Sequence, residues 1–507
     1  MTTDPNNPPD SPESADALPR RDFLRVAGAS AGLFMVGGTE LPAKNLSPIV
    51  KASANVRSTS ASPEVIVIGA GGWGSFTALN LVQRGLKVTL VDAYGPGNAR
   101  STSGDETRGV RSSYGDRPGE QGENWTIWAR ESMKMWTAFD DEWGKHSRLN
   151  LFHVTGDLIM RNEWDNFQLR TKVWWDKHKI PYEVLNPADV KKAFPVISMD
   201  DITAVLYEPD AGVVRARRAA QAAASAFETL GGKIVIGRAS VSKESNGKLE
   251  EIVLDTGQRL RADTFVWCVG PWMAKTFPEL LAKKARAPMG YVVYFATPVN
   301  DQRFTFPNLP SYNFPGVTGW AALPVDNRGF RVRGAERAPG TTPATAAAPA
   351  GGGRGAGTGG GGGRGGGQQA DVPPAQLDPD TSDRWADQTR IDGSRRFIAH
   401  RFPLLATAPV SQTHSCHYES TSSGNFIVDK HPGMTNCWIV AGGNSEGFKF
   451  CPWIGDHASK RITGVEFDPA IVKAFKIPEK EYEPSAPANP ADSTRRPVRP
   501  PPGSSDD

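Results

Sequence analysis

The first clear pattern of apolar and polar positions lies after about sixty residues of polar, proline-rich chain. Val65–Ile68 is an apolar run typical of a buried strand, and Gly69–Gly74 reads G-x-G-x-x-G. A helix is predicted over Ser75–Arg84 and a second strand over Lys87–Val91, which ends in Asp92. This order of strand, glycines, helix, strand and acid predicts a βαβ unit that binds a dinucleotide.

Each of the three glycines and the acid of that pattern has a physical role. Gly69 turns the chain, Gly71 lets the backbone approach a pyrophosphate, and Gly74 lets the helix pack on the strand, while Asp92 accepts hydrogen bonds from the adenosine ribose. The alternative is a glycine-rich turn that binds nothing. The unit alone does not separate FAD from NAD.

Later patterns predict a second domain. Beyond residue 125, tryptophan-rich stretches at helical spacing alternate with the strand-like Leu158–Met160, and these tryptophans are predicted to be core residues rather than a cofactor site. Further strands are predicted at Tyr291–Phe295 and Gly329–Arg333. Between these stretches the chain returns to the first domain through a helix and two strands, predicted over Arg217–Leu230, Lys233–Ile236 and Thr264–Cys268.

Composition narrows the class of partner. The 507 residues carry 58 basic and 55 acidic side chains, a net charge of +3, so the charge balance does not favour nucleic acid or an anionic membrane as partner. A small molecule is therefore expected, and no metal site is predicted. The Ala/Pro/Gly-rich stretch at 338–371 and the proline-rich tail at 480–507 cannot bury a core and are expected to be disordered.

The N-terminus carries a predicted twin-arginine export signal. Arg20 and Arg21 precede Phe23 and Leu24 at the expected offset, followed by a weakly apolar stretch over Val26–Gly38 that is too short to span a bilayer. The alternative is a chance pair of arginines. Export by the Tat machinery predicts a periplasmic or extracytoplasmic protein, with an uncertain cleavage position near residues 52–54.

One segment indicates the cofactor, because it is similar to a sequence motif of known proteins. Gly104–Gly115 contains Asp105, Thr107, Arg108 and Arg111 in a pattern similar to G-D-T-R-x-x-R-x-x-Y-G, with one extra residue inserted. It resembles the flavin-contacting stretch of the monomeric sarcosine oxidases and N-methyltryptophan oxidases of the D-amino acid oxidase superfamily. The resemblance continues in the same order to about residue 465, through Glu208–Val213, Cys268–Trp272, Cys416–Tyr418, Phe426–Pro432 and Gly447–Phe450.

The resemblance implies an α/β fold. A Rossmann-type FAD-binding domain is expected to be interleaved with an α+β substrate domain built on an antiparallel sheet. The expected order is signal and linker at 1–60; FAD-binding domain at 63–120, 205–285 and 412–465; and substrate domain at 121–204 and 286–411.

For the cofactor, the resemblance implies FAD joined covalently to Cys416 through a thioether to a methyl carbon of the flavin ring. A thiolate favoured by nearby cations suits that reaction. The alternatives are a buried free cysteine or a disulfide with Cys268, Cys437 or Cys451. Arg108 is expected among the cofactor-binding residues, and the N–H groups around Gly442 and Gly443 are expected to polarise the pyrimidine end of the flavin.

For the substrate, the resemblance implies a carboxylate clamp. Arg111 and Lys449 match the family's carboxylate-binding pair, an arginine fork and a lysine point charge. Hydride transfer from the amine-bearing carbon to flavin N5 then gives an imine that water hydrolyses. For either residue alone, a surface ion pair is the simpler interpretation.

The sequence also departs from the family. Arg331 stands where a lysine assists the reaction with oxygen, and the substrate-side tyrosine is replaced by Trp320 or Ala321. Ala335 stands near the position at which the family has a histidine. Arg331 and Arg333 alternate along a strand and face one side, which is either the flavin or a solvent-exposed edge.

The predicted function is an exported FAD-dependent oxidoreductase that oxidises the C–N bond of a secondary or primary amine or amino acid. Oxygen is the expected electron acceptor. One alternative is a dehydrogenase that uses a quinone or a periplasmic carrier, and the other is a flavoprotein scaffold without catalysis. The replaced pocket residues make sarcosine itself a doubtful substrate.

Overall fold

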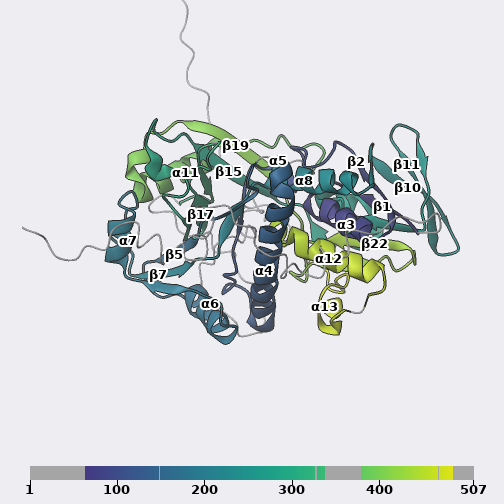
Figure 1. Ribbon diagram of the computed structural model, residues 1–507, viewed down its shortest axis with the longest axis horizontal. Helices are drawn as coiled ribbons and strands as arrows, with labels where there is room; N and C mark the ends of the chain where they lie inside the picture. Colours follow the sequence, from purple (N-terminus) through teal and green to yellow (C-terminus); the bar gives the residue numbers. More distant parts are fainter. Residues whose placement is uncertain (1–62, 148, 326–327, 337–377, 466, 483–507) are drawn as a thin grey trace, which may run out of the picture.

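The predicted βαβ unit forms the centre of a six-stranded sheet (Figure 1). In the computed structural model, which describes residues 63–147, 149–325, 328–336, 378–465 and 467–482, β1 (Glu64–Ile68) pairs in parallel with β2 (Lys87–Asp92) and β13 (Thr264–Trp267). The strand order is β21-β22-β13-β1-β2-β9, completed by β9 (Lys233–Ile236), β21 (Ile427–Lys430) and β22 (Cys437–Ala441). The predicted export signal and glycine-rich insertion lie outside the described residues.

Both faces of this sheet are covered, which explains the continuous apolar run of its first strand. Val65 and Val67 face a core shared with helices, whereas Ile66 and Ile68 face a second core. On the first face lie α3 (Gly72–Gln83), α8 (Ala216–Thr229) and α12 (Cys451–Ile462). On the second lies a small antiparallel sheet of β10 (Ala239–Ser245), β11 (Lys248–Leu254) and β12 (Arg259–Leu260).

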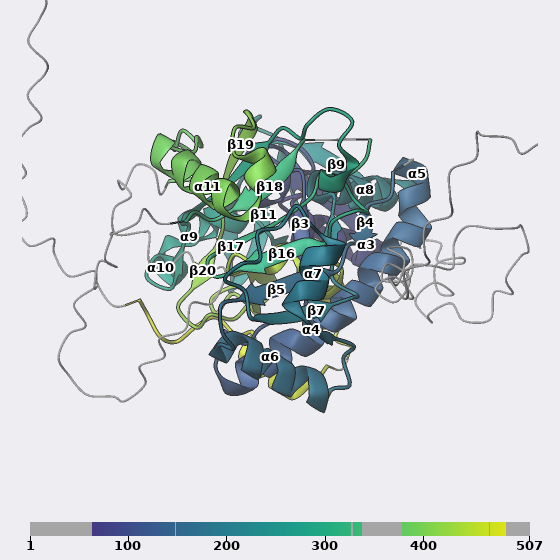
Figure 2. The same ribbon diagram turned by 90° about the vertical axis from the view of Figure 1, so that its left-hand side faces the viewer.

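The second domain is built on an eight-stranded sheet, which faces the viewer in Figure 2. The sheet is mixed rather than purely antiparallel, because β16 and β5 pair in parallel. Its order is β19-β15-β18-β17-β16-β5-β7-β6, with bounds β19 (Val410–His417), β15 (Met289–Phe295), β18 (Phe330–Arg333), β17 (Val317–Trp320), β16 (Ser311–Phe314), β5 (Asp157–Arg161), β7 (Ala204–Glu208) and β6 (Glu183–Leu185). Its helices are α6 (Asn166–Lys177), α7 (Pro187–Ala193) and α11 (Gln388–Arg401).

Several predicted domain boundaries are wrong at their ends. Strands β7 and β19 were assigned to the FAD-binding domain, yet both belong to the eight-stranded sheet. Helix α4 (Gly119–Phe139) was assigned to the substrate domain, yet Trp125, Trp128 and Trp136 lie in the core of the six-stranded sheet's helical face. The core role predicted for the tryptophans is confirmed, but the core is that of the other domain.

A third, small sheet joins the two domains. Strand β8 (Gly212–Val214) pairs with β3 (Arg108–Val110) on one side and β4 (Phe152–Val154) on the other. Strand β3 begins at Arg108 and Arg111 directly follows it, so this sheet holds the segment that carries both residues.

Near the start of the tail predicted from residue 480, Tyr482 is held by hydrogen bonds to Lys283 and Ser420. Residues 483–507 lie outside the described part of the chain.

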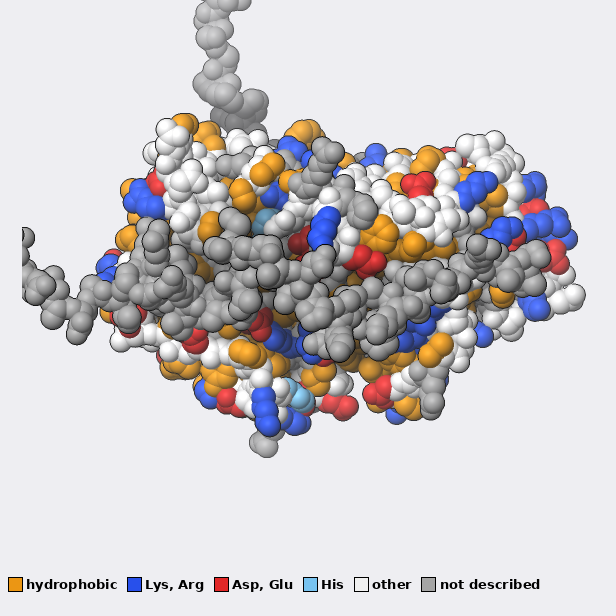
Figure 3. All heavy atoms as spheres, viewed as in Figure 1, with side chains coloured by type: hydrophobic (Ala, Val, Ile, Leu, Met, Phe, Trp, Pro, Cys, Tyr) orange, Lys and Arg blue, Asp and Glu red, His pale blue; other side chains and the backbone are white. Residues whose placement is uncertain are grey.

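The surface agrees with the near-neutral charge balance. On the face in Figure 3, Lys and Arg side chains lie interspersed with Asp and Glu. None of the helices in the described part of the chain combines the length and apolar character needed to cross a membrane.

Candidate functional site

A cavity of about 550 Å³ opens at the ends of β1 and β2, next to the glycine turn. Gly69, Gly71 and Gly72 form part of its wall. Gly69 has φ +103°, and a Cβ there would stand 2.4 Å from the carbonyl oxygen of Cys268. A Cβ on Gly74 would stand 1.7 Å from the Gly69 carbonyl oxygen, so this glycine allows helix α3 to pack under the turn.

Asp92 ends β2 and lines the same cavity. Its Oδ2 accepts a 2.7 Å hydrogen bond from the Ala70 N–H, and its Oδ1 accepts from the N–H groups of Tyr94 and Gly95, each at 2.8 Å. Burial raises the pKa of Asp92, and these three hydrogen bonds oppose that rise. Asp92 therefore shapes the loop of the cavity wall, and its contact with a ribose stays a prediction.

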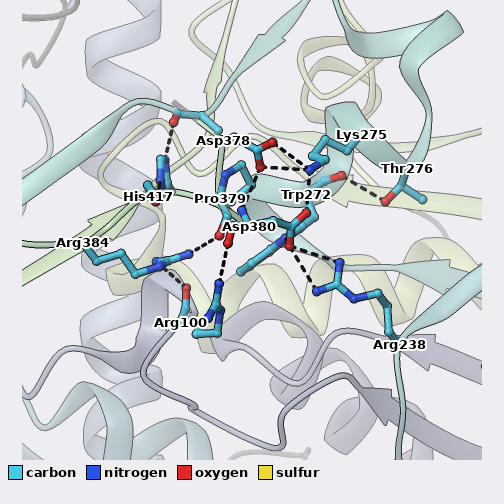
Figure 4. A network of polar contacts seen from close by, with 12 residues as sticks. Arg100, Arg238, Trp272, Lys275, Thr276, Asp378, Pro379, Asp380, Arg384 and His417 are labelled. Carbon is cyan, nitrogen blue, oxygen red and sulfur yellow. Dashed lines mark hydrogen bonds and ion pairs between the residues drawn. The ribbon is translucent and has the colours of Figure 1, made fainter. Parts of the chain in front are cut away.

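Residues 378–384, here named the clasp, form a network of polar contacts (Figure 4), and Asp380 of the clasp lines the same cavity. Asp380 accepts hydrogen bonds from Trp272 Nε1 at 2.8 Å, Lys275 Nζ at 2.5 Å and Arg238 at 3.1 Å. Although burial opposes it, these donors lower the pKa of Asp380. The clasp was assigned to the substrate domain by sequence, but its contacts place it on the cofactor side of the molecule.

The glycines expected at the pyrimidine end of the flavin are engaged elsewhere. The N–H groups of Gly442 and Gly443 donate to Oε2 of Glu419 at 2.9 and 3.4 Å. Of the two, Gly443 lines the large cavity, as does Glu419. Burial raises the pKa of Glu419 to about 7, and its Oε1 has no hydrogen-bond partner. Without a bound flavin these two N–H groups are engaged by Glu419, and their direct role at the pyrimidine end of the flavin stays a prediction.

A smaller cavity of about 60 Å³ adjoins the first, with Arg108 and Tyr418 lining both. Cys416 lies on β19 in the wall of the smaller cavity, and Arg108 Nη2 is 3.2 Å from its sulfur. Burial would raise the pKa of the Cys416 thiol, but Arg108 and then His414 lower it to about 6. All four cysteines of the chain are free thiols, so the disulfide alternative is wrong.

The predicted clamp residues meet in the smaller cavity, although 338 positions separate them in the sequence numbering. Arg111 makes no hydrogen bond or ion pair with any residue that the structure describes. Lys449 is 3% exposed and its Nζ lies 2.5 Å from Glu446 Oε2. Burial lowers the pKa of Lys449 to about 8 against the effect of Glu446, and the pKa of Glu446, which burial would raise, is lowered to about 2 by Lys449, Arg111 and Arg333.

Arg331 also reaches the smaller cavity, so the solvent-edge alternative is wrong. Its side chain is 2% exposed, its Nη2 lies 3.3 Å from Asp105 Oδ2, and its guanidinium stacks on Trp320 at 4.0 Å. Asp105 also pairs with Arg108. Arg333 lines the same cavity, which confirms that the two arginines of β18 face one side.

Sequence reasoning missed the roles of three acids: Asp105, Glu419 and Glu446. Asp105 and Glu446 stand inside motifs singled out for their basic residues, and Glu419 directly follows the Cys416–Tyr418 motif, which is a usable signal. Arg108 and Lys449 pair with Asp105 and Glu446 within their own motifs, but other partners come from distant segments: Arg331 is 226 positions from Asp105, and Gly442 is 23 from Glu419. No cluster of three His, Cys, Asp or Glu suited to a metal ion occurs among the described residues.

The two cavities fit a flavin dinucleotide. The larger has glycines in its wall where a dinucleotide needs the backbone to come close, and at Gly72 a Cβ would stand 2.4 Å from Cys451 Sγ. Buried polar atoms without partners occur in both walls: Glu419 Oε1 in the larger, and Arg331 Nε and Nη1 in the smaller. Such atoms are normally satisfied by a ligand or water.

Comparison with known proteins agrees with this interpretation. The chain is 24% identical to monomeric sarcosine oxidase from Bacillus sp. over 82% of this chain and 97% of that protein, and 23% identical to N-methyl-L-tryptophan oxidase from Yersinia pestis over 78% and 94%. The structure of glycine oxidase from Bacillus cereus superposes with a TM-score of 0.62 at 16% identity, over 83% of this chain and 100% of that one. Residues 64–461 match the family described as FAD dependent oxidoreductase, and the chain belongs to that family.

Proposed function

We propose that the protein oxidises the C–N bond of a small amine or amino acid that carries a carboxylate. The observation that carries this proposal is Arg111, a guanidinium without a partner among the described residues, in a cavity beside Cys416 and the FAD-sized cavity. The curated relatives are named for the oxidation of amino acids, sarcosine and N-methyl-L-tryptophan, and this agrees with a carboxylate clamp.

Within this proposal, FAD supplies the acceptor for the hydride that leaves the amine-bearing carbon. Arg111 holds the substrate carboxylate through its fork, and Lys449 adds a charge on the same side. Two fixed contacts orient the substrate so that one C–H bond points along a single direction. Trp320 and Phe448 also line the cavity, and their apolar surfaces lower the local dielectric, which strengthens these charge contacts.

We further propose that Cys416 holds FAD covalently. Joining the thiol sulfur to a flavin methyl carbon moves two hydrogens to the flavin ring, so the ring itself is the oxidant. A pKa of about 6 keeps Cys416 mostly as thiolate at neutral pH, and Arg108 stabilises that charge at 3.2 Å.

Oxygen is the proposed electron acceptor, and a quinone or periplasmic carrier is the second candidate. The observation that favours the second is the pairing of Arg331 with Asp105, because a neutralised guanidinium stabilises a superoxide charge less than a free cation does. The reoxidation rate of the reduced protein in air separates the two.

Anaerobic addition of candidate amines to the yellow protein tests the proposal. Loss of the flavin absorbance near 450 nm is expected; persistence of the colour with every amine would favour the scaffold alternative. The matched control is Arg111→Met, in which the same amines should bleach the flavin far more slowly at equal concentration.

Export through the Tat machinery remains part of this proposal, since residues 1–62 lie outside the described part of the chain. Cell fractionation of the wild-type chain and of a variant with Arg20→Lys and Arg21→Lys tests it. The wild type is expected outside the cytoplasm and the double variant inside; equal distribution of both would remove the export proposal.

A further inference from the structure

The smaller cavity carries more positive charge than a single carboxylate would balance. Five of its lining residues are basic: Arg108, Arg111, Arg331, Arg333 and Lys449. Two carboxylates lie against them. Asp105 contacts the guanidinium groups of Arg108 and Arg331, and Glu446 contacts Lys449 at 2.5 Å.

Two guanidinium groups remain without a close anion. Arg111 forms no ion pair or hydrogen bond within the described ranges, and Asp157 and Glu446 act on it only over a longer range. The nearest carboxylate oxygen to Arg333 is Oε1 of Glu446, and the Nη1–Oε1 distance is 3.9 Å. Glu446 is already bonded to Lys449 through its other oxygen, so it compensates Arg333 only weakly.

Arg333 and Arg111 reach the smaller cavity from different segments of the chain. Arg333 stands on β18 opposite Val292 of β15 and Thr318 of β17, and both of those residues line the cavity. Arg111 comes from the segment that follows β3, and both guanidinium groups act on Glu446. The side chain of Arg333 is 26% exposed, so it can exchange water for a ligand without unfolding a neighbour.

From this arrangement we propose that the substrate is a short amino dicarboxylate, with the carboxylate next to the amine on Arg111 and a second carboxylate on Arg333. The proposal rests on the amine oxidation proposed above. Arg331 is held by Asp105 and Trp320, so Arg333 is the arginine available for the second acid. A partly buried guanidinium can hold a carboxylate through two charge-assisted hydrogen bonds, which makes a second acid a determinant of affinity.

Binding of unreactive acids tests the proposal without any turnover. The holoprotein is titrated with succinate and malonate, and in parallel with propionate and acetate, while the flavin absorbance is followed. The dicarboxylates are expected to bind at least about tenfold more tightly than the monocarboxylates, since a second charge-assisted pair forms. Equal affinity of the two classes would overturn the proposal.

Arg333→Gln identifies the residue responsible. It is expected to remove the advantage of the dicarboxylates and to leave the monocarboxylate affinities within about threefold of the wild type. The matched control is Arg328→Gln, which removes one charge just before the same strand at a position 46% exposed and should change neither affinity. An equal loss for both classes of acid in Arg333→Gln would contradict a second acid site.

Turnover separates this inference from the proposed function. N-methylaspartate and iminodiacetate are compared with sarcosine for bleaching of the flavin, and higher kcat/KM is expected for the dicarboxylates. If dicarboxylates bind tightly while no amine bleaches the flavin, the proposed reaction fails and the acid site stands. If sarcosine bleaches the flavin faster than both dicarboxylates, the reaction stands and the dicarboxylate proposal fails.

Discussion

The two cavities treat a buried carboxyl group in opposite ways. In the larger cavity, burial raises the pKa of Glu419 to about 7, and among the described residues its hydrogen bonds come from backbone N–H groups of two glycines. In the smaller cavity, Lys449, Arg111 and Arg333 overcome the effect of burial and lower the pKa of Glu446 to about 2. Glu419 is therefore partly protonated near neutral pH, whereas Glu446 is ionised.

This contrast matches what each cavity is built to hold. FAD brings its own negative charge on the pyrophosphate, and the glycine turn with the N-terminus of α3 offers backbone N–H groups to such a charge in the wall of the larger cavity. A carboxylate substrate needs fixed cations, and the smaller cavity supplies them from several segments. Arg108 lies on the boundary, because it lines both cavities and contacts the Cys416 sulfur.

The largest expected effect concerns that boundary. In the wild-type protein, acid precipitation should leave the pellet yellow, whereas Cys416→Ser should release all of the flavin to the supernatant. Because burial, Arg108 and His414 set the thiol pKa at about 6, attachment of FAD to the apoprotein should accelerate as the pH rises through about 6 and then level off.

The control for this linkage is Cys437→Ala, since burial raises the thiol pKa of Cys437 to about 12 and the residue lies on β22. The precipitated Cys437→Ala protein should stay yellow. A colourless wild-type pellet would show that FAD is not attached covalently to Cys416.

The next effect concerns the clamp. Arg111→Ala should raise the KM for a carboxylate-bearing amine by roughly two to four orders of magnitude, because removing one partner of a desolvated charge pair costs roughly 2–5 kcal/mol. Steady-state kinetics measure it, and Arg111→Lys should retain part of the affinity. An unchanged KM in Arg111→Ala would place substrate binding outside the smaller cavity.

Because the pKa of Glu419 is raised and that of Glu446 is lowered, the two residues should change the stability of the protein with pH in opposite directions. The folded-state pKa of Glu419 is raised above the ordinary value of 4.5, so the wild type loses stability as the pH rises from about 4.5 to about 7. Glu419→Gln should therefore be more stable than the wild type at pH 8, by about 3 kcal/mol, and equal to it near pH 4.

Glu446→Gln is the contrasting variant. The folded-state pKa of Glu446 is depressed to about 2, so its contribution to stability is present above about pH 4.5 and is lost as the pH falls towards 2. Urea unfolding across this pH range measures both variants. If the stabilities of the two variants depend on pH in the same way, Glu419 and Glu446 do not differ in protonation as predicted.

The smallest effect concerns oxygen. Arg331→Lys should speed reoxidation of the reduced protein by oxygen severalfold, because an ammonium is a compact charge, whereas the guanidinium is stacked on Trp320 and paired with Asp105. Stopped-flow mixing with aerated buffer measures it. Arg333→Lys should leave the rate unchanged; rapid reoxidation of the wild type, unaffected by Arg331→Lys, would remove Arg331 from this step.

Some of the site was predictable because local patterns specify local geometry. The strand, glycine turn, helix and acid of residues 64–92 appear as β1, α3 and β2 with ends shifted by a few residues. The family motif also indicated Arg111, Lys449 and Cys416, which the structure brings to one cavity. Periodicity likewise identified the core tryptophans, although it assigned them to the wrong domain.

What the sequence by itself determined is the chemistry available: a dinucleotide fold, a cysteine, and arginines in family motifs. Only the tertiary structure decided which charged side chains have no close counter-charge among the described residues. Asp105 and Arg331 are far apart in the chain, as are Glu419 and Gly442, and each pairing depends on how two sheets meet. Because a charge in a low-dielectric cavity is governed by its nearest partners, the availability of Arg111 and Arg333 follows from those distances and not from residue type.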